Sequence, residues 1–186
     1  MSPSINLQQG ANASLGELMP VVGTVVVGFG WRLIESNGPV TELVPSAIVC
    51  DADGKALSDE HLVFFNQLAA PDGAVRFVDG GDEEQIEVDL AAVPERVDKI
   101  VFVVYIDPDL RKPSTYSSVR SAYFRLTDRS GTELVRHDIV IASGSQSTAM
   151  IFGEVYRHRG AWKVRAVGQG YSTGLKGVAA DFGVEI

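Results

Sequence analysis

The chain has 186 residues, of which 45% are hydrophobic and 22% charged, a balance that is typical of one globular domain and excludes general disorder. A single cysteine, Cys50, excludes an internal disulfide, and the sequence contains neither a signal peptide nor an apolar run long enough to span a membrane. The net charge of −8 disfavours nucleic-acid binding. We therefore expect a single cytoplasmic domain over residues 1–186.

The charge is unevenly distributed along the chain. Residues 51–109 contain 15 acidic and 4 basic side chains, whereas residues 110–186 contain 6 acidic and 11 basic ones. Segments of opposite charge can attract each other within the fold, or each can bind an oppositely charged surface of a neighbouring molecule. A basic stripe on the C-terminal third stays open as an alternative.

Short apolar alternations and β-branched runs dominate the sequence, and helical periodicity is scarce. These runs predict about ten strands, at 24–33, 46–51, 61–66, 74–78, 84–90, 99–106, 121–127, 133–141, 149–158 and 161–168. Short helices are predicted at 90–99 and 174–182. Strands at this spacing indicate a mainly β fold, a β-sandwich of two packed sheets.

Turn residues and one apolar run refine this prediction. An Arg-Gly pair (159–160) separates the last two strands and is a hairpin signal. The segments DADGK (51–55), APDGA (70–74) and RSGT (129–132) place glycine where a positive φ is needed. The run KIVFVVYI (99–106) is apolar throughout, which predicts a central strand covered on both sides.

The sequence offers no motif for catalysis. His61, His137 and His158 are far apart and, with one cysteine, do not have the spacing of zinc ligands. The glycines of GFGW (28–31) and GQGYSTG (168–174) lack the spacing of a dinucleotide site and are better explained by close packing or bulges in strands. We therefore expect a non-enzymatic protein. An enzyme or small-molecule binder that uses GQGYSTG and His158 is the alternative.

One acidic turn stands out, VDGGDEEQ (78–85). Asp79, Asp82, Glu83 and Glu84 surround two glycines and precede a strand alternation. Carboxylates on a flexible turn can converge on Ca²⁺, which takes 6–8 oxygen ligands. The alternative is a solvated turn, in which the repulsion among the four acids lowers stability.

Two other acidic segments bear on a cation site. The turn DADGK (51–55) has the Asp-x-Asp-Gly pattern of a calcium loop, but Leu62 stands at the twelfth position, which excludes an EF-hand and favours a hairpin turn. The segment DPD (107–109) follows the buried strand and adds carboxylates at its end.

Six blocks of the sequence together resemble one known family: VGFGW (27–31), DADGK (51–55), FFNQLAAPDGAV (64–75), DEEQIEVDLAAVPERVDKIVFVVYI (82–106), AMIFGEVYRHRGAWKVRAVGQGYSTGL (149–175) and DFGV (181–184). In their order and spacing they resemble the TerD family of bacterial tellurium-resistance and stress-response proteins, from about residue 1 to residue 184. The resemblance implies a two-sheet β-sandwich and a calcium-binding, non-catalytic cytoplasmic protein. It also implies action with other Ter-type proteins, including peripheral contact with the inner membrane face.

The resemblance further implies that Ca²⁺ lies between two elements, and both are altered in this sequence. The first has two aspartates flanking a leucine, followed by Ala-Ser, and corresponds to TELVPSA (41–47). Glu42 takes the first aspartate position, Val44, which cannot ligate, takes the second, and Ser46 matches. The second element, a long loop with an acidic end, is shortened to residues 78–85.

We therefore expect calcium binding to be weakened or lost, with Ca²⁺ as a candidate cofactor of one remaining site. The candidate ligands are Glu42, Asn66, Asp79, Asp82, Glu83 and Glu84. Strand alternation lets Asp82 and Glu84 converge while Glu83 turns away. The leading hypothesis is a TerD-like protein of the tellurite or general stress response that acts through protein contacts. The alternative is a Ca²⁺ sensor or buffer that uses the shortened acidic loop.

Three residues carry further hypotheses. Trp31 and Trp162 are candidate anchors for partners, although both lie in strand patterns that favour core positions. Cys50 is a candidate thiol for tellurite reduction, but its apolar run SAIVC (46–50) favours packing as a small hydrophobe.

Overall fold

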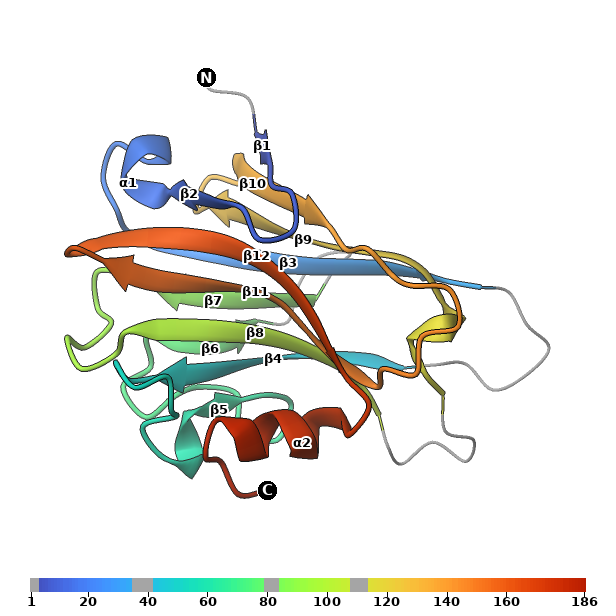
Figure 1. Cartoon of the computed structure of the whole chain (residues 1–186). Helices are drawn as coiled ribbons and strands as arrows, with labels where there is room; N and C mark the ends of the chain where they lie inside the picture. Colours follow the sequence, from blue (N-terminus) through green and yellow to red (C-terminus); the bar gives the residue numbers. More distant parts are fainter. Residues whose placement is uncertain (1–3, 35–41, 79–83, 108–113) are drawn as a thin grey trace.

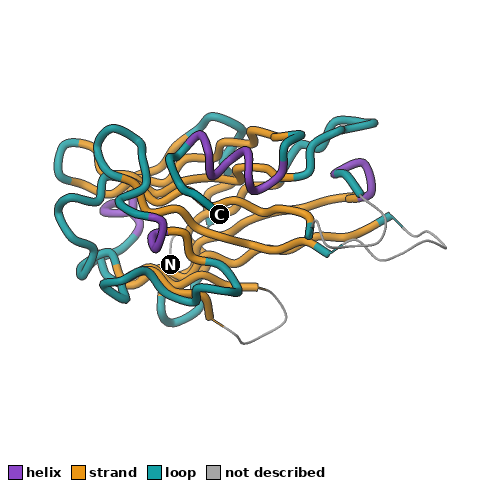
Figure 2. The backbone as a smooth tube through the Cα atoms, turned by 90° about the horizontal axis from the view of Figure 1, so that it is seen from below, coloured by secondary structure: helices purple, strands orange, loops and turns teal. Residues whose placement is uncertain are grey.

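The computed structural model describes residues 4–34, 42–78, 84–107 and 114–186. Within these residues, twelve strands form two six-stranded sheets that pack face to face, and two short helices lie outside them (Figure 1). The strands run lengthwise, and the connecting loops gather at the two ends of the sandwich (Figure 2). The predicted mainly β fold with two packed sheets is confirmed.

The first sheet is called the β3 sheet. In spatial order it contains β1 (Ile5–Asn6), β10 (Glu133–Asp138), β9 (Val119–Asp128), β3 (Thr24–Leu33), β7 (Glu84–Asp89) and β6 (Val75–Val78). The pair β1–β10 is parallel, and the other neighbours are antiparallel. The chain therefore returns to this sheet from the second one several times.

The second sheet is called the β8 sheet. In spatial order it contains β2 (Asn12–Ser14), β12 (Ala161–Tyr171), β11 (Ala149–His158), β8 (Lys99–Ile106), β4 (Leu43–Cys50) and β5 (Leu62–Val63). All of its pairs are antiparallel. Helix α1 (Leu15–Leu18) follows β2, and helix α2 (Gly174–Asp181) follows β12.

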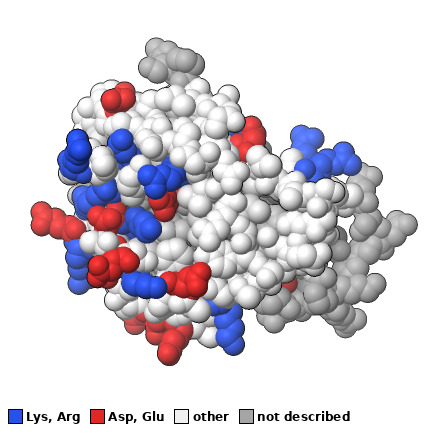
Figure 3. Space-filling view, in the orientation of Figure 1, with Lys and Arg blue, Asp and Glu red and all other residues white. Residues whose placement is uncertain are grey.

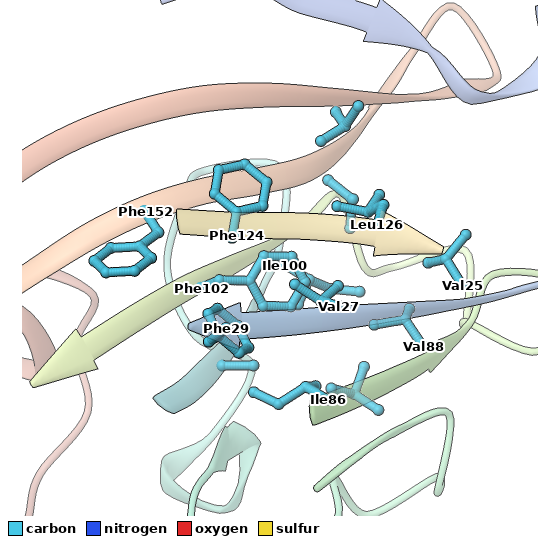
Figure 4. Close-up of a cluster of buried hydrophobic side chains, with 14 of the residues drawn as sticks. Val25, Val27, Phe29, Ile86, Val88, Ile100, Phe102, Phe124, Leu126 and Phe152 are labelled. Atoms are coloured by element: carbon cyan, nitrogen blue, oxygen red, sulfur yellow. The ribbon is translucent and has the colours of Figure 1, made fainter. Parts of the chain in front are cut away.

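The main core lies between the sheets and follows from strand alternation. On β3, Val25, Val27 and Phe29 point inward and are buried. The Phe29 ring centre lies 6.1 Å from that of Phe102 and 6.2 Å from that of Phe152, both on the β8 sheet (Figure 4). Full burial of such a side chain contributes about 1.5–3 kcal/mol, so these rings hold the two sheets together.

Strand β8 is covered on both faces, as its apolar run predicted. Alternate residues from Ile100 to Ile106 face the core between the sheets. The intervening residues from Val101 to Tyr105 belong to a second apolar cluster that includes Ala179 of α2. Helix α2 thus supplies the cover that a strand with two apolar faces requires.

The helix predicted at 90–99 is wrong, because this segment forms separate turns. Pro94 disfavours the α conformation of the residue before it. Arg157 of β11 also binds the segment: its Nε donates to the Val97 carbonyl at 2.8 Å, and its Nη2 donates to the carbonyls of Val93 and Pro94 at 3.1 Å each. A side chain from another strand therefore fixes a conformation that the local sequence does not show.

The remaining elements agree with the prediction in type and differ in extent. The helix predicted at 174–182 is confirmed as α2. The strand predicted at 61–66 is reduced to β5, preceded by a 3-10 turn over Asp59–His61. The strand predicted at 133–141 ends at Asp138. Strands β1 and β2 and helix α1 were not predicted, since two to four residues carry no readable period.

The predicted turns are confirmed by their backbone angles. Arg159 and Gly160 have φ values of 52° and 77° and join β11 to β12 as a hairpin. Gly54, Gly73 and Gly131 have φ values of 76°, 77° and 91°. Glycine is needed at these positions because other residues rarely adopt this backbone conformation.

Candidate functional site

A groove opens between the two sheets at one end of the sandwich, and we call it the carboxylate groove. Its volume is about 710 Å³. The described residues that line it are Trp31, Leu33, Glu42, Leu43, Val44, Pro45, Phe65, Phe77, Glu84 and Asp107. The groove thus combines apolar walls with three carboxylates.

Strand pairing brings the three carboxylates to this end. Within the β8 sheet, β4 pairs with β8 in antiparallel register from Leu43 opposite Ile106, and the N–H of Asp107 donates to the Glu42 carbonyl at 3.0 Å. Glu84 comes from the β3 sheet, where it begins β7 opposite Phe29. Each carboxylate therefore marks the end of a strand, and together they come from both layers.

The structure unites part of the predicted ligand set. Glu42 and Glu84 line the groove together. Asn66 does not line it, because this residue lies at the exposed tip of the turn between Phe64 and Gln67. The remaining candidates, Asp79, Asp82 and Glu83, lie outside the described residues.

Asp107 is a groove residue that the candidate ligand set omitted. Its signal in the sequence was the DPD segment directly after the buried strand. Only the register of β4 against β8 reveals that Asp107 lies beside Glu42, which is 65 positions earlier in the chain. The residue type was evident from the sequence, whereas its neighbour is evident only from the strand pairing.

Few side chains of this groove can supply oxygen ligands to a metal ion. Among the described residues, no three Asp, Glu, His or Cys side chains lie together closely enough to hold a metal ion. Val44 contributes an apolar wall, and Ser46 is fully buried with its hydroxyl donating to the Val103 carbonyl at 2.9 Å. Of the segment 41–47, Glu42 is the residue that presents a carboxylate to the groove.

The turn DADGK (51–55) uses its first carboxylate internally. Oδ1 of Asp51 accepts hydrogen bonds from the backbone N–H groups of Asp53 at 2.9 Å and Lys55 at 3.1 Å. Cys50 pairs with Ala56 across the turn. The hairpin turn predicted for this segment is confirmed.

The two tryptophans differ in position. Trp162 is buried in the core, with the guanidinium of Arg157 4.4 Å from its ring centre. Trp31 is half-buried, packs against the core and also lines the carboxylate groove. Core packing is therefore confirmed for Trp162, whereas Trp31 keeps a surface that a partner can touch.

The Cys50 thiol is poorly placed to react with tellurite or another oxidant. It is fully buried on β4 and belongs to the apolar cluster under α2. Burial raises its pKa to about 12, so the thiol stays protonated at neutral pH, and the thiolate is the reactive form. The packing role that the sequence favoured is confirmed.

Charged side chains are mixed on the face seen in Figure 3, with basic and acidic groups interspersed at one side and an uncharged centre. On β7 of the β3 sheet, Glu87 pairs with Arg76 at 2.7 Å and with Arg129 at 3.9 Å. The second of these pairs joins the acidic middle of the sequence to its basic end, as the charge distribution led us to expect. Among the described residues, no helix has the length and apolar character needed to cross a membrane.

Comparison with known proteins identifies similar chains. A model of the TerD domain matches residues 3–182. The tellurium resistance protein TerD of Serratia marcescens is 40% identical over 189 residues, covering 97% of this chain and 98% of that protein. General stress protein 16U of Bacillus subtilis (strain 168) is 35% identical over 192 residues, covering 98% of this chain and 99% of that protein.

Solved structures support the same fold. A crystal structure of a protein of unknown function has a TM-score of 0.70 at 23% identity and covers 89% of this chain and 99% of its own. A homologue of telluride resistance protein (TerD) from Streptomyces coelicolor A3(2) has a TM-score of 0.65 at 20% identity and covers 86% of this chain and 96% of its own. At these identities the likeness applies to the fold alone.

Proposed function

The chain belongs to the TerD family, and on that premise we propose that it is a non-enzymatic protein of the tellurite or general stress response that acts through contacts with other proteins. Relatives named for tellurium resistance and for general stress match nearly its whole length, which supports the stress-response part of the proposal. A cytoplasmic location, contact with other Ter-type proteins and peripheral contact with the inner membrane face through them belong to the same proposal.

The observation that carries the proposal is the composition of the carboxylate groove. Trp31, Phe65 and Phe77 supply aromatic surface, and Phe65 is 56% exposed. Glu42 and Glu84 add negative charge from opposite sheets. Aromatic groups dominate the energetics of protein interfaces, and complementary charge selects the partner. The groove therefore suits a partner segment with an apolar side chain flanked by lysine or arginine.

Weakened calcium binding is part of this proposal. Calcium affinity depends on the number and charge of the oxygen ligands. Val44 lacks an oxygen donor on its side chain, and the Ser46 hydroxyl is buried and bonded to backbone. Glu42 is then left as the carboxylate of the first calcium element.

A second candidate function is a Ca²⁺ sensor or buffer, and one observation favours it. Glu42 and Asp107 from the β8 sheet and Glu84 from the β3 sheet line the same groove, although among the described residues they do not form a cluster of three metal ligands. A cation held there would link the two layers at their open end. Binding would then raise the stability of the whole sandwich, by about 2.7 kcal/mol at 100 times the Kd.

Crosslinking tests the protein-contact proposal. A photoreactive phenylalanine analogue at position 65, in cells exposed to tellurite, is expected to capture another Ter-type protein. That protein, once purified, should bind the Glu42→Gln, Glu84→Gln double variant at least about tenfold more weakly than the wild type, because two charges of the groove are lost. A Glu17→Gln variant, changed at an exposed position of α1, serves as the control. Equal affinity of both variants would place the contact elsewhere.

Titration calorimetry decides between the two candidates. Ca²⁺ is added to chelator-stripped protein, with Mg²⁺ as the control ion. The leading proposal expects no saturation below about 1 mM, the weak end of the range for protein calcium sites. Saturation at micromolar Ca²⁺, lost in a Glu84→Gln variant, would instead establish the sensor or buffer.

A further inference from the structure

A second cavity lies beside α2, and we call it the α2 pocket. It has a volume of about 600 Å³, within the range of small-molecule sites in proteins. It is bounded by the end of β8, the turn after β5, the first turn of α2 and the C-terminal Ile186. The last residues of the glycine-rich segment GQGYSTG (168–174) form part of its wall.

Most of the surface that lines the pocket is apolar. Phe64 and Phe65 make an edge-to-face pair with ring centres 5.4 Å apart, and Leu175 of α2 also lines the pocket. Phe65 and Ile186 are each 56% exposed, so large apolar groups border this space without being taken up by either core. Exposed apolar surface gathered around a cavity marks a binding site for an apolar group.

Tyr105 supplies a hydrogen-bond donor to this space. The residue lines the pocket and is 3% exposed, yet its hydroxyl has no hydrogen-bond partner among the described residues. Tyr116, which is buried as deeply, donates to the Val104 carbonyl at 2.7 Å. Buried tyrosine hydroxyls normally find a partner. Burial raises the pKa of Tyr105, so its hydroxyl keeps its proton at neutral pH and can donate it.

Positive charge lies at the α2 side of the pocket. Lys176, in the first turn of α2, lines the pocket and forms no ion pair with another described residue. The first N–H groups of a helix lack acceptors within the helix and attract anions. Thr173, at the N-cap position, makes no side-chain bond to them. This end of the pocket thus favours an acidic group.

One carboxylate side chain, Asp107, is among the described residues that line the α2 pocket. Asp107 and Phe65 also line the carboxylate groove, so they form the border between the two spaces. Tyr105 is close enough to Asp107 for the carboxylate to help raise the pKa of the tyrosine, so an anion that binds the Tyr105 hydroxyl must lie on its α2 side, where Lys176 offsets the charge of Asp107.

We propose that the α2 pocket binds a small amphipathic acid with an aromatic or acyl body. The body packs against Phe64, Phe65 and Leu175. The acidic group accepts the hydrogen bond of Tyr105 and faces Lys176 and the start of α2. Among the described residues, the site contains no residue of the calcium elements 41–47 and 78–85, and it shares only the border residues Phe65 and Asp107 with the carboxylate groove.

A fluorescence titration tests this site in the whole chain, in buffer containing a chelator. The probe is 1-anilinonaphthalene-8-sulfonate, an aromatic anion that fluoresces in apolar surroundings. We expect saturable binding at one site, displaced by octanoate and at least about tenfold less well by the neutral octanamide. Tyr105→Phe and Lys176→Gln should each weaken probe binding about 3- to 10-fold, the loss expected for one hydrogen bond or charge contact.

The matched control variants change a tyrosine and a lysine of the β8 sheet that do not line the pocket. Tyr156→Phe on β11 and Lys163→Gln on β12 should keep the wild-type affinity within about twofold. Phenylalanine retains the packing of the tyrosine ring, so Tyr105→Phe preserves the fold. The proposal is overturned if probe binding does not saturate, if both pocket variants bind as the wild type does, or if octanamide competes as well as octanoate.

Discussion

The guanidinium of Arg157 lies 4.4 Å from the ring centre of Trp162, its cross-strand partner, and stacks on that ring. The same group donates three hydrogen bonds to the backbone of residues 93–97, at 2.8–3.1 Å. A planar group with several donors can make both kinds of contact at once, which a lysine ammonium cannot. Arg157 therefore ties the end of the β11–β12 hairpin to the connection before β8.

Arg157→Lys is expected to destabilise the protein by about 2 kcal/mol, because part of this hydrogen-bond set and the stacking are lost. For a chain of this length that corresponds to a fall in Tm of about 4–8 °C, measured by thermal unfolding. Arg159→Lys, in the exposed hairpin turn two residues later, is the matched control and should leave Tm unchanged. Equal Tm values for the two variants would show that the contacts of Arg157 contribute nothing.

Arg157 also explains why one prediction from the sequence failed while others succeeded. Strands β3 and β8 have the predicted bounds, because ten and eight residues of apolar pattern report directly on burial. Segment 90–99 has the composition of a short helix, but its conformation depends on a side chain about 60 positions later in the sequence. Local periodicity contains no information about such a contact.

Gly153→Ala is expected to destabilise the protein by about 1–3 kcal/mol through overpacking. Gly153 lies at an irregularity of β11, and a Cβ there would come within 2.7 Å of the Arg165 carbonyl oxygen and 2.5 Å of the Phe124 ring. The carbonyl belongs to the paired strand and cannot rotate away. Urea unfolding measures the loss. Gly23→Ala, where no heavy atom lies within 4 Å of the added carbon, is the control. A neutral Gly153→Ala would mean that the β11 irregularity relaxes freely.

Stability should fall as the pH drops through about 6.5, and His61 is one cause. Burial lowers its pKa, although Asp72 opposes this. Its Nδ1 bonds to the Ser58 hydroxyl at 2.7 Å, while its buried Nε2 has no partner among the described residues. The unfolded chain, with a histidine pKa of about 6.5, therefore takes up a proton more readily than the folded one. By linkage, the free energy of unfolding decreases below that pH.

Urea unfolding of the wild type and of His61→Gln between pH 5 and pH 8 measures this effect. The variant should show a shallower decrease than the wild type below about pH 6.5, whatever its absolute stability. His158→Gln, at the exposed end of β11, is the control for replacing a histidine by glutamine. If the free energy of unfolding depended on pH in the same way for the wild type and His61→Gln, His61 would not be a cause of the decrease.

Cys50 should be unreactive in the folded protein. Its thiol is buried, and burial raises its pKa to about 12, so only a minute fraction is thiolate at pH 8. We expect a disulfide reagent to label it no faster than the chain unfolds, and Cys50→Ala to leave tellurite resistance of cells unchanged. Rapid labelling of the native protein, or loss of resistance in a variant that still folds, would return Cys50 to consideration as a reductant.

The sites were less predictable than the strands, for physical reasons. Glu42 and Glu84 were identified by type and by family pattern, but their meeting with Asp107 follows from the register of β4 and β8. The α2 pocket was visible in the sequence only as GQGYSTG (168–174), since glycines and hydroxyls do not specify a ligand. That the Tyr105 hydroxyl has no hydrogen-bond partner among the described residues emerges only from the structure.

Val44→Asp tests whether one position limits calcium binding. Val44 lines the carboxylate groove with Glu42 and Asp107, and it is the position where the resemblance to the family led us to expect a second aspartate. A third carboxylate on this side adds a hard oxygen ligand and also adds repulsion, because like charges in one site disfavour each other.

In chelator, Val44→Asp should therefore unfold at a lower temperature than the wild type. Millimolar Ca²⁺ should restore most of that loss, since a ligand that binds only the folded state adds about 2.7 kcal/mol at 100 times its Kd. Val44→Asn, which has nearly the same shape without the charge, should respond much less, and Mg²⁺ should not replace Ca²⁺, because Mg²⁺ requires a smaller and more regular set of ligands. If Ca²⁺ leaves the melting temperature of Val44→Asp unchanged, the valine is not the residue that limits calcium binding, and the segment 78–85 becomes the next one to change.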